Sequence, residues 1–74
     1  MLLFVHVQGA ERLIAVLARP RHTVRHLIEE LQEGIPVEDW SVTTWPRPAR
    51  VFRADRTLGE EGVVDGDTLI MTLN

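Results

Sequence analysis

Two histidines have a spacing that could support metal chemistry. His22 and His26 stand four residues apart, so on one helix face both imidazoles could reach the same ion. His22, however, precedes the expected first residue of a helix, and the chain has no cysteine and no evident third ligand nearby. The pattern therefore favours a solvated helix entrance, and the sequence predicts no metal and no other cofactor.

Four carboxylates precede the last apolar run of the chain: Glu60, Glu61, Asp65 and Asp67. Paired carboxylates can act as acid and base or bind a divalent ion. Their spacing is not that of an EF-hand, and turns commonly carry such residues for solubility and for local hydrogen bonds. The sequence also contains no recognisable catalytic triad or phosphate loop, so it predicts a protein that is not an enzyme.

The basic residues of the chain are all arginines, eight against eleven acidic residues, and the net charge is −3. This balance argues against nucleic acid as the main partner. Four arginines could form a basic edge for an acidic partner, or a solvated edge guarded by charge: Arg47, Arg50, Arg53 and Arg56. The absence of lysine means that no side-chain amine could carry an isopeptide-linked chain.

The chain has 74 residues, and we expect a single domain over residues 1–74. A domain of this size buries only about 60% of its unfolded surface, which leaves little room for an enclosed active site. No apolar run approaches the roughly 20 residues that span a membrane, and the N-terminus lacks the basic region of a signal peptide. With no cysteine either, the expected location is the cytoplasm, without membrane insertion.

Periodicity predicts the elements of the fold. Strand-like residues 1–8 and 12–18, joined at Gly9, should pair as an antiparallel hairpin. Thr23 should cap a helix whose apolar stripe ends before Gly34 and Pro36. The members of that stripe are Val24, Leu27, Ile28 and Leu31.

Further strands are expected at residues 40–45, at 51–53 as a short edge strand beside Pro46 and Pro48, and at 68–73. Trp40 should anchor part of the core, and Trp45 should lie near the surface. The predicted fold class is α+β, a mixed sheet of four to five strands with one helix packed on one face.

One helix cannot cover both faces of such a sheet. If Leu3, Val5 and Val7 point toward the helix, the alternation sends Leu2, Phe4 and His6 to the other face. The same reasoning leaves Leu13 and Leu17 outside in the second strand, joined by Ile70 from the last strand. An apolar patch of this kind usually marks an interface, and Trp45 is a candidate hot spot beside it. The alternative is that a loop or a changed register covers part of the patch.

This order of elements resembles the ubiquitin β-grasp fold. The resemblance rests on Pro20, the Thr23-capped helix, the Glu33-Gly34-Ile35-Pro36 exit and Thr57-Leu58 before the last strand. Within that superfamily, Trp40 and the pattern from Leu58 through Gly62-Val63 and Gly66-Asp67 to Leu69 are most similar to the bacterial YukD/EsaB type. Those small ubiquitin-like proteins are associated with type VII secretion.

The resemblance implies a bacterial, non-catalytic protein that acts through protein–protein contacts, with secretion machinery as a partner or with a second copy in a homodimer through the open face. The alternative is a protein modifier whose C-terminal carboxylate is activated and attached to targets by activating, conjugating and processing enzymes, at Leu73 and Asn74. Conjugated relatives end in two glycines, whereas this sequence has none after Gly66. A glycine pair passes through narrow enzyme channels where a Cβ would clash.

Overall fold

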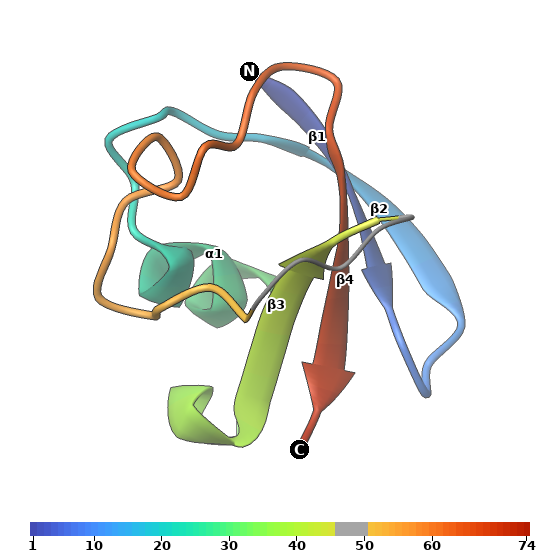
Figure 1. Ribbon diagram of the computed structural model, residues 1–74. Coiled ribbons are helices and arrows are strands. Elements are labelled where there is room, and N and C mark those ends of the chain that lie inside the picture. Colours follow the sequence, from blue (N-terminus) through green and yellow to red (C-terminus); the bar gives the residue numbers. More distant parts are fainter. Residues whose placement is uncertain (46–50) are drawn as a thin grey trace.

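The computed structural model describes residues 1–45 and 51–74, and its elements follow the predicted order (Figure 1). They are β1 (Leu2–Val7), β2 (Arg12–Leu17), α1 (Val24–Leu31), the 3₁₀ turn η1 (Val37–Asp39), β3 (Trp40–Thr44) and β4 (Thr68–Leu73). The strands form one mixed sheet in the order β2-β1-β4-β3 within these residues. The α+β class is thus confirmed, and the arrangement is consistent with a β-grasp-like fold.

The sheet is built around a parallel central pair. β1 runs antiparallel to β2 and parallel to β4, and β4 runs antiparallel to β3. Alternation along β1 buries Leu3, Val5 and Val7 on the face that α1 covers, as the sequence predicts. Figure 1 shows α1 on one side of the sheet, while the side beyond β1 and β2 carries no helix in the described part of the chain.

The helix begins where the sequence predicts. The Thr23 hydroxyl accepts a hydrogen bond from the His26 amide at 3.1 Å, which satisfies one of the free N–H groups of the first turn. Val24, Leu27 and Ile28 are buried under it. After α1, the side chain of Gln32 bonds both backbone groups of Ile35, at 2.8 and 3.3 Å. These bonds close the turn that leads to η1.

The short edge strand expected at residues 51–53 is not formed, and that prediction is wrong. This segment makes one ladder-like bond, from the Phe52 amide to the Val42 carbonyl at 2.8 Å. The next free amide, that of Arg53, donates instead to the Glu61 carboxylate at 2.8 Å. A side chain therefore takes the Arg53 amide, which alternation turns away from β3, and the described bonds of residues 51–53 do not continue into a ladder. Pro46, Arg47, Pro48 and Arg50 lie outside the described residues.

Much of the core comes from segments without regular structure. Leu58 is fully buried, and Phe52 and Val63 are nearly so. The turn that carries Leu58 is held against the entrance of α1, because the Leu58 amide donates to the His22 carbonyl at 2.8 Å. At Gly59 a Cβ would lie 3.2 Å from the Pro20 carbonyl oxygen, so this approach favours glycine. Trp40 is half-buried and packs against the same core, as predicted.

Candidate protein-interaction surface

The face of the sheet opposite α1, here called the open face, collects the outward side chains of the strands. Strand pairing sets Phe4 between Ala15 and Thr68, and His6 between Leu13 and Ile70. At one end of the face, Leu2 lies opposite Leu17 in the register. The structure thus places the predicted strand residues on one surface: Leu2, Phe4, His6, Leu13, Leu17 and Ile70.

Trp45 extends this surface beyond the end of β3. Its amide donates to the Thr68 carbonyl at 2.9 Å, so Trp45 lies next to Thr68 and continues the cross-strand row of Ala15, Phe4 and Thr68. A shallow groove of about 490 Å³ results. It is lined by Phe4, His6, Glu11, Leu13, Trp45 and Thr68.

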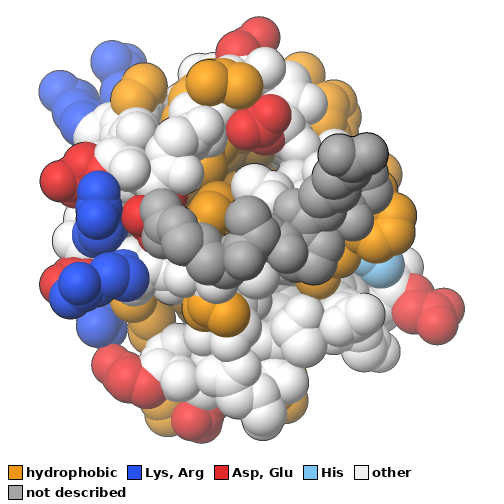
Figure 2. All heavy atoms as spheres, in the orientation of Figure 1, with side chains coloured by type: hydrophobic (Ala, Val, Ile, Leu, Met, Phe, Trp, Pro, Cys, Tyr) orange, Lys and Arg blue, Asp and Glu red, His pale blue; other side chains and the backbone are white. Residues whose placement is uncertain are grey.

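The two leucines of β2 are unusually open for aliphatic residues. Leu13 is 65% exposed and Leu17 is 81% exposed, and Trp45 is exposed as well. Each large aliphatic side chain left in water forgoes roughly 1.5–3 kcal/mol of burial. Figure 2 shows hydrophobic side chains along its right-hand edge, where the β1–β2 hairpin lies in Figure 1, and arginines gathered on the left. The arginines visible in this view thus lie away from the β1–β2 hairpin.

Two residues of the groove were missed from the sequence, Glu11 and Thr68. Both continue the alternation of residues that were predicted, since Glu11 is two before Leu13 and Thr68 is two before Ile70. Glu11 lies in the hairpin turn with a φ of 50°, so it could not be assigned to a strand face by periodicity. It places one carboxylate at the rim of an otherwise mainly apolar groove.

The histidine pair lies at the entrance of α1. The two rings have centroids 4.5 Å apart and are tilted by 41°. His22 Nδ1 accepts from the Arg19 amide at 3.4 Å, and His26 Nε2 lies 2.9 Å from a Glu30 oxygen. Among residues 1–45 and 51–74, no group of three or more potential ligands gathers around a common point.

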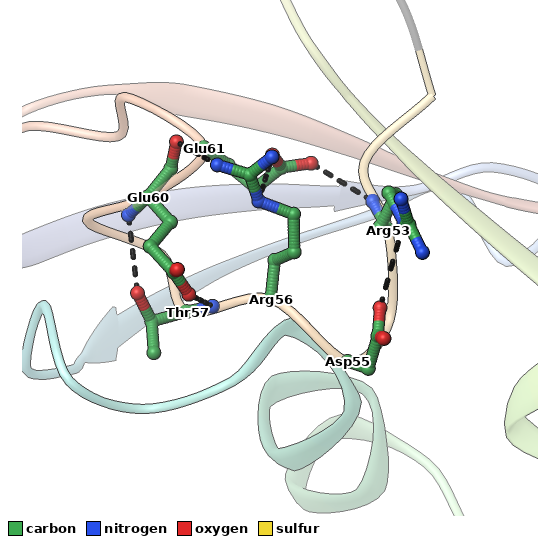
Figure 3. Close-up of polar contacts among 6 residues, drawn as sticks. All are labelled: Arg53, Asp55, Arg56, Thr57, Glu60 and Glu61. Carbon is green, nitrogen blue, oxygen red and sulfur yellow. Dashed lines mark hydrogen bonds and ion pairs between the residues drawn. The ribbon is translucent and has the colours of Figure 1, made fainter.

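The four carboxylates before β4, those of Glu60, Glu61, Asp65 and Asp67, all accept hydrogen bonds from backbone amides; Figure 3 shows the first two. Glu61 is buried and points toward Arg53 and Arg56. Its Oε2 accepts from the Arg53 amide at 2.8 Å, and its Oε1 lies 3.3 Å from Arg56 Nε. The Arg56 Nε–H group is buried and has no aligned acceptor, so its contact with Glu61 is an ion pair without a hydrogen bond. Asp65 and Asp67 accept from the Leu2 and Val64 amides, at 2.6 and 3.0 Å.

Glu60 and Thr57 cap each other. The Thr57 amide donates to the Glu60 carboxylate at 2.9 Å, and the Glu60 amide donates to the Thr57 hydroxyl at 3.1 Å (Figure 3). The bond from the Thr57 backbone, with help from its hydroxyl, lowers the pKa of Glu60. On the other side of the molecule, a backbone hydrogen bond and then the Arg25 guanidinium lower the pKa of Glu38.

The lowered pKa of Glu60 predicts an acid-dependent loss of stability. Because its folded pKa lies below the unfolded one, its contribution is present above the ordinary glutamate range and is lost as pH falls through the folded value. Urea unfolding between about pH 6 and pH 3 should show a smaller pH dependence in Glu60→Gln than in the parent, because an amide stays neutral. Glu29→Gln, on the exposed face of α1, is the matched control. Equal profiles for Glu60→Gln and the parent would contradict the assignment.

Residue 74, just after β4, continues the antiparallel register of β4 and β3 and lies beside η1. The Asn74 amide donates to the Asp39 carbonyl at 2.7 Å, and its side-chain amide donates to the Glu38 carbonyl at 3.3 Å. Ser41 also donates from its hydroxyl to the Asn74 side chain. Leu73 is exposed beside these bonds. Residue 74 is therefore held against the body of the protein.

Comparison with known proteins adds no relative: no family model and no curated protein sequence matches this chain. No helix in the described part of the chain has the length and apolar character needed to cross a membrane. Of the four arginines of the predicted basic edge, Arg53 pairs with Asp55 at 3.7 Å and Arg56 with Glu61, while Arg47 and Arg50 are not described. The two described arginines thus form ion pairs within their own loop.

Proposed function

We propose that this chain is a non-catalytic, ubiquitin-like protein that binds a partner protein on the open face of its sheet. The observation that carries the proposal is the groove between Leu13 and Trp45 on a face with no covering helix among the described residues. The expected occupant is an apolar side chain of the partner, because the walls of the groove are mainly apolar. The bacterial, cytoplasmic and YukD-like assignment, with a role beside type VII secretion, belongs to the same proposal and rests on the sequence resemblance.

The non-covalent reading is preferred over that of a conjugated modifier, because the open face offers a groove that can take a partner side chain. Of the two residues named for conjugation, Leu73 and Asn74, the second is used within the fold, where it bonds to Asp39, Glu38 and Ser41. A covalent adenylate at the C-terminus, detected by mass spectrometry after incubation with ATP and an activating enzyme, would overturn the preference.

Leu13→Asp is expected to remove partner binding without unfolding the protein. Leu13 is 65% exposed, so the change removes little core packing, yet it puts a charge on the wall of the groove. Desolvating that charge should weaken binding by about a hundredfold. The measurement is isothermal titration of the purified partner, identified by its retention on the parent protein, with circular dichroism to check the fold.

Ile35→Asp is the matched control, since Ile35 is an exposed aliphatic residue in the turn after α1, away from the open face. It should bind the partner as the parent does. Equal affinities of the parent and Leu13→Asp would show that the open face is not the site. Equal loss in both variants would show that general surface charge controls the binding, and would also contradict the proposal.

A further inference from the structure

β2 is an edge strand of the sheet. Met1 and Ala18 exchange two backbone bonds beside it, at 2.7 and 2.9 Å. Because bonded and non-bonded pairs alternate in an antiparallel ladder, every second residue of β2 then points its N–H and C=O away from β1. The outward-pointing residues are Leu13, Ala15 and Leu17. None of their backbone groups bonds to another described residue outside the β1–β2 pair.

This edge lacks the devices that usually prevent strand addition. Natural edges carry lysine, proline, a bulge or a charge within the strand. β2 reads Arg-Leu-Ile-Ala-Val-Leu, with its one charge at the first residue. Leu13 and Leu17 are exposed on the open face, and Ile14 and Val16 are only half-buried on the helix face. A second strand would therefore cover apolar surface on both sides of β2.

The sequence around β2 is complementary to itself. Counted outward from Ala15, Leu13 mirrors Leu17, and Glu11 mirrors Arg19. Leu13, Ala15 and Leu17 share one face of β2, while Glu11 lies in the turn before the strand and Arg19 lies just beyond its end. Glu11 lines the groove on the open face, and Arg19 lies beside Leu17 in a second groove of about 390 Å³. Neither charge forms an ion pair with a described residue.

We propose that β2 pairs antiparallel with β2 of a second copy, across a two-fold axis at Ala15, and joins two sheets into one. In this register Ala15 opposes Ala15, Leu13 opposes Leu17 of the second copy, and Glu11 opposes Arg19 of the second copy. Each opposed pair of outward residues exchanges two N–H···O bonds. The apolar pairs lie side by side, and opposite charges close both ends.

Other registers lose part of this complementarity. A slip of one residue sets outward backbone groups against inward ones, and a slip of two sets Glu11 opposite Leu17. The charge pattern also favours a second copy over an unrelated extended peptide, which has no reason to carry the mirrored pair. An edge contact of this length lies at the low end of interface sizes, below about 1,200 Å², so we expect a dimer of micromolar affinity.

The dimer goes beyond the proposed function, although Glu11 and Leu13 contribute to both surfaces. It uses the edge of β2, whereas the partner site uses the groove between Leu13 and Trp45 on the open face. Pairing would set two such grooves on one continuous sheet face. Partner binding could fail while the dimer forms, and the reverse also holds, so the two tests fail separately.

Cysteine cross-linking tests the register, and the chain has no cysteine of its own. Ala15→Cys should form a covalent dimer under mild oxidation, because directly opposed residues have Cα atoms about 5.5 Å apart, within disulfide range. Leu17→Cys alone should react at least about tenfold more slowly, since the Cα atoms of the two copies of this residue would lie about 14 Å apart. Mixing Leu13→Cys with Leu17→Cys should restore fast cross-linking. The readout is non-reducing gel electrophoresis of the folded protein.

A charge exchange tests the same pairing without cysteine. Glu11→Arg alone and Arg19→Glu alone should each raise the dimer dissociation constant about tenfold in sedimentation equilibrium at low salt, and the double exchange should restore it. Cross-linking of Leu17→Cys alone as fast as Ala15→Cys would overturn the proposal. So would a failure of the double exchange to restore dimerisation, or a folded parent protein that stays monomeric while an extended peptide from another protein binds the β2 edge.

Discussion

Leu58→Ala is expected to lower the free energy of unfolding by about 3 kcal/mol. Leu58 is fully buried although it lies in a turn and not in a helix or strand. Its truncation removes apolar contacts and leaves a cavity in the core. The other members of that core, from β1, α1 and β4 among others, are buried as well. A domain of this length has roughly 4–11 kcal/mol of stability in total, so the loss is a large part of it.

Urea unfolding followed by circular dichroism measures this effect. Val64→Ala is the matched control, because Val64 lies six residues further along the same connection and is 59% exposed. We expect the control to change stability by less than about 0.5 kcal/mol. A Leu58→Ala variant as stable as Val64→Ala would show that the 57–63 connection is not part of the core.

Glu61→Ala should destabilise the protein by about 2 kcal/mol. The Glu61 side chain is fully buried, and its loss leaves the Arg53 amide without its acceptor and the buried Arg56 Nε without its counter-charge. Arg56 is 41% exposed overall, so water compensates part of the ion pair, and the hydrogen bond to the backbone carries most of the effect.

Glu60→Ala is the comparison that separates the two neighbouring acids. Glu60 is exposed and caps a single turn, so its removal should cost clearly less than that of Glu61 in the same urea experiment. Equal losses in the free energy of unfolding for the two variants would mean that burial of Glu61 adds nothing to its contribution to stability.

Local patterns were sufficient for most of the fold. The strand alternation in residues 1–8 and the stripe from Val24 to Leu31 depend on neighbours in sequence, and both were recovered within one or two residues. The strand predicted at residues 51–53 is not formed: the Phe52 amide bonds to β3, and the next amide, that of Arg53, turns the other way and donates to the Glu61 carboxylate. Nothing in the sequence distinguishes Glu61 from Glu60, since only the packed loop decides which of the two is buried.

The sequence predicted which strand residues share the open face, but it did not predict the groove on that face. Alternation correctly places Phe4, Leu13 and Leu17 on one face. The groove arises only because β4 lies between β1 and β3, which brings the row of Trp45 into line with Phe4. Phe4 and Trp45 are some forty residues apart in the sequence. Periodicity within one strand does not predict how such distant segments are aligned.

The most direct test of the central claim is a titration of the ¹⁵N-labelled protein with its purified partner, followed by amide and indole chemical shifts. We predict the largest changes at the Trp45 indole and at the amides of β1 and β2, around Phe4 and Leu13, with little change along α1. Changes confined to α1 and to the loop from Arg53 to Glu61, with Trp45 and Leu13 unmoved, would contradict the account and assign binding to the basic side of the molecule.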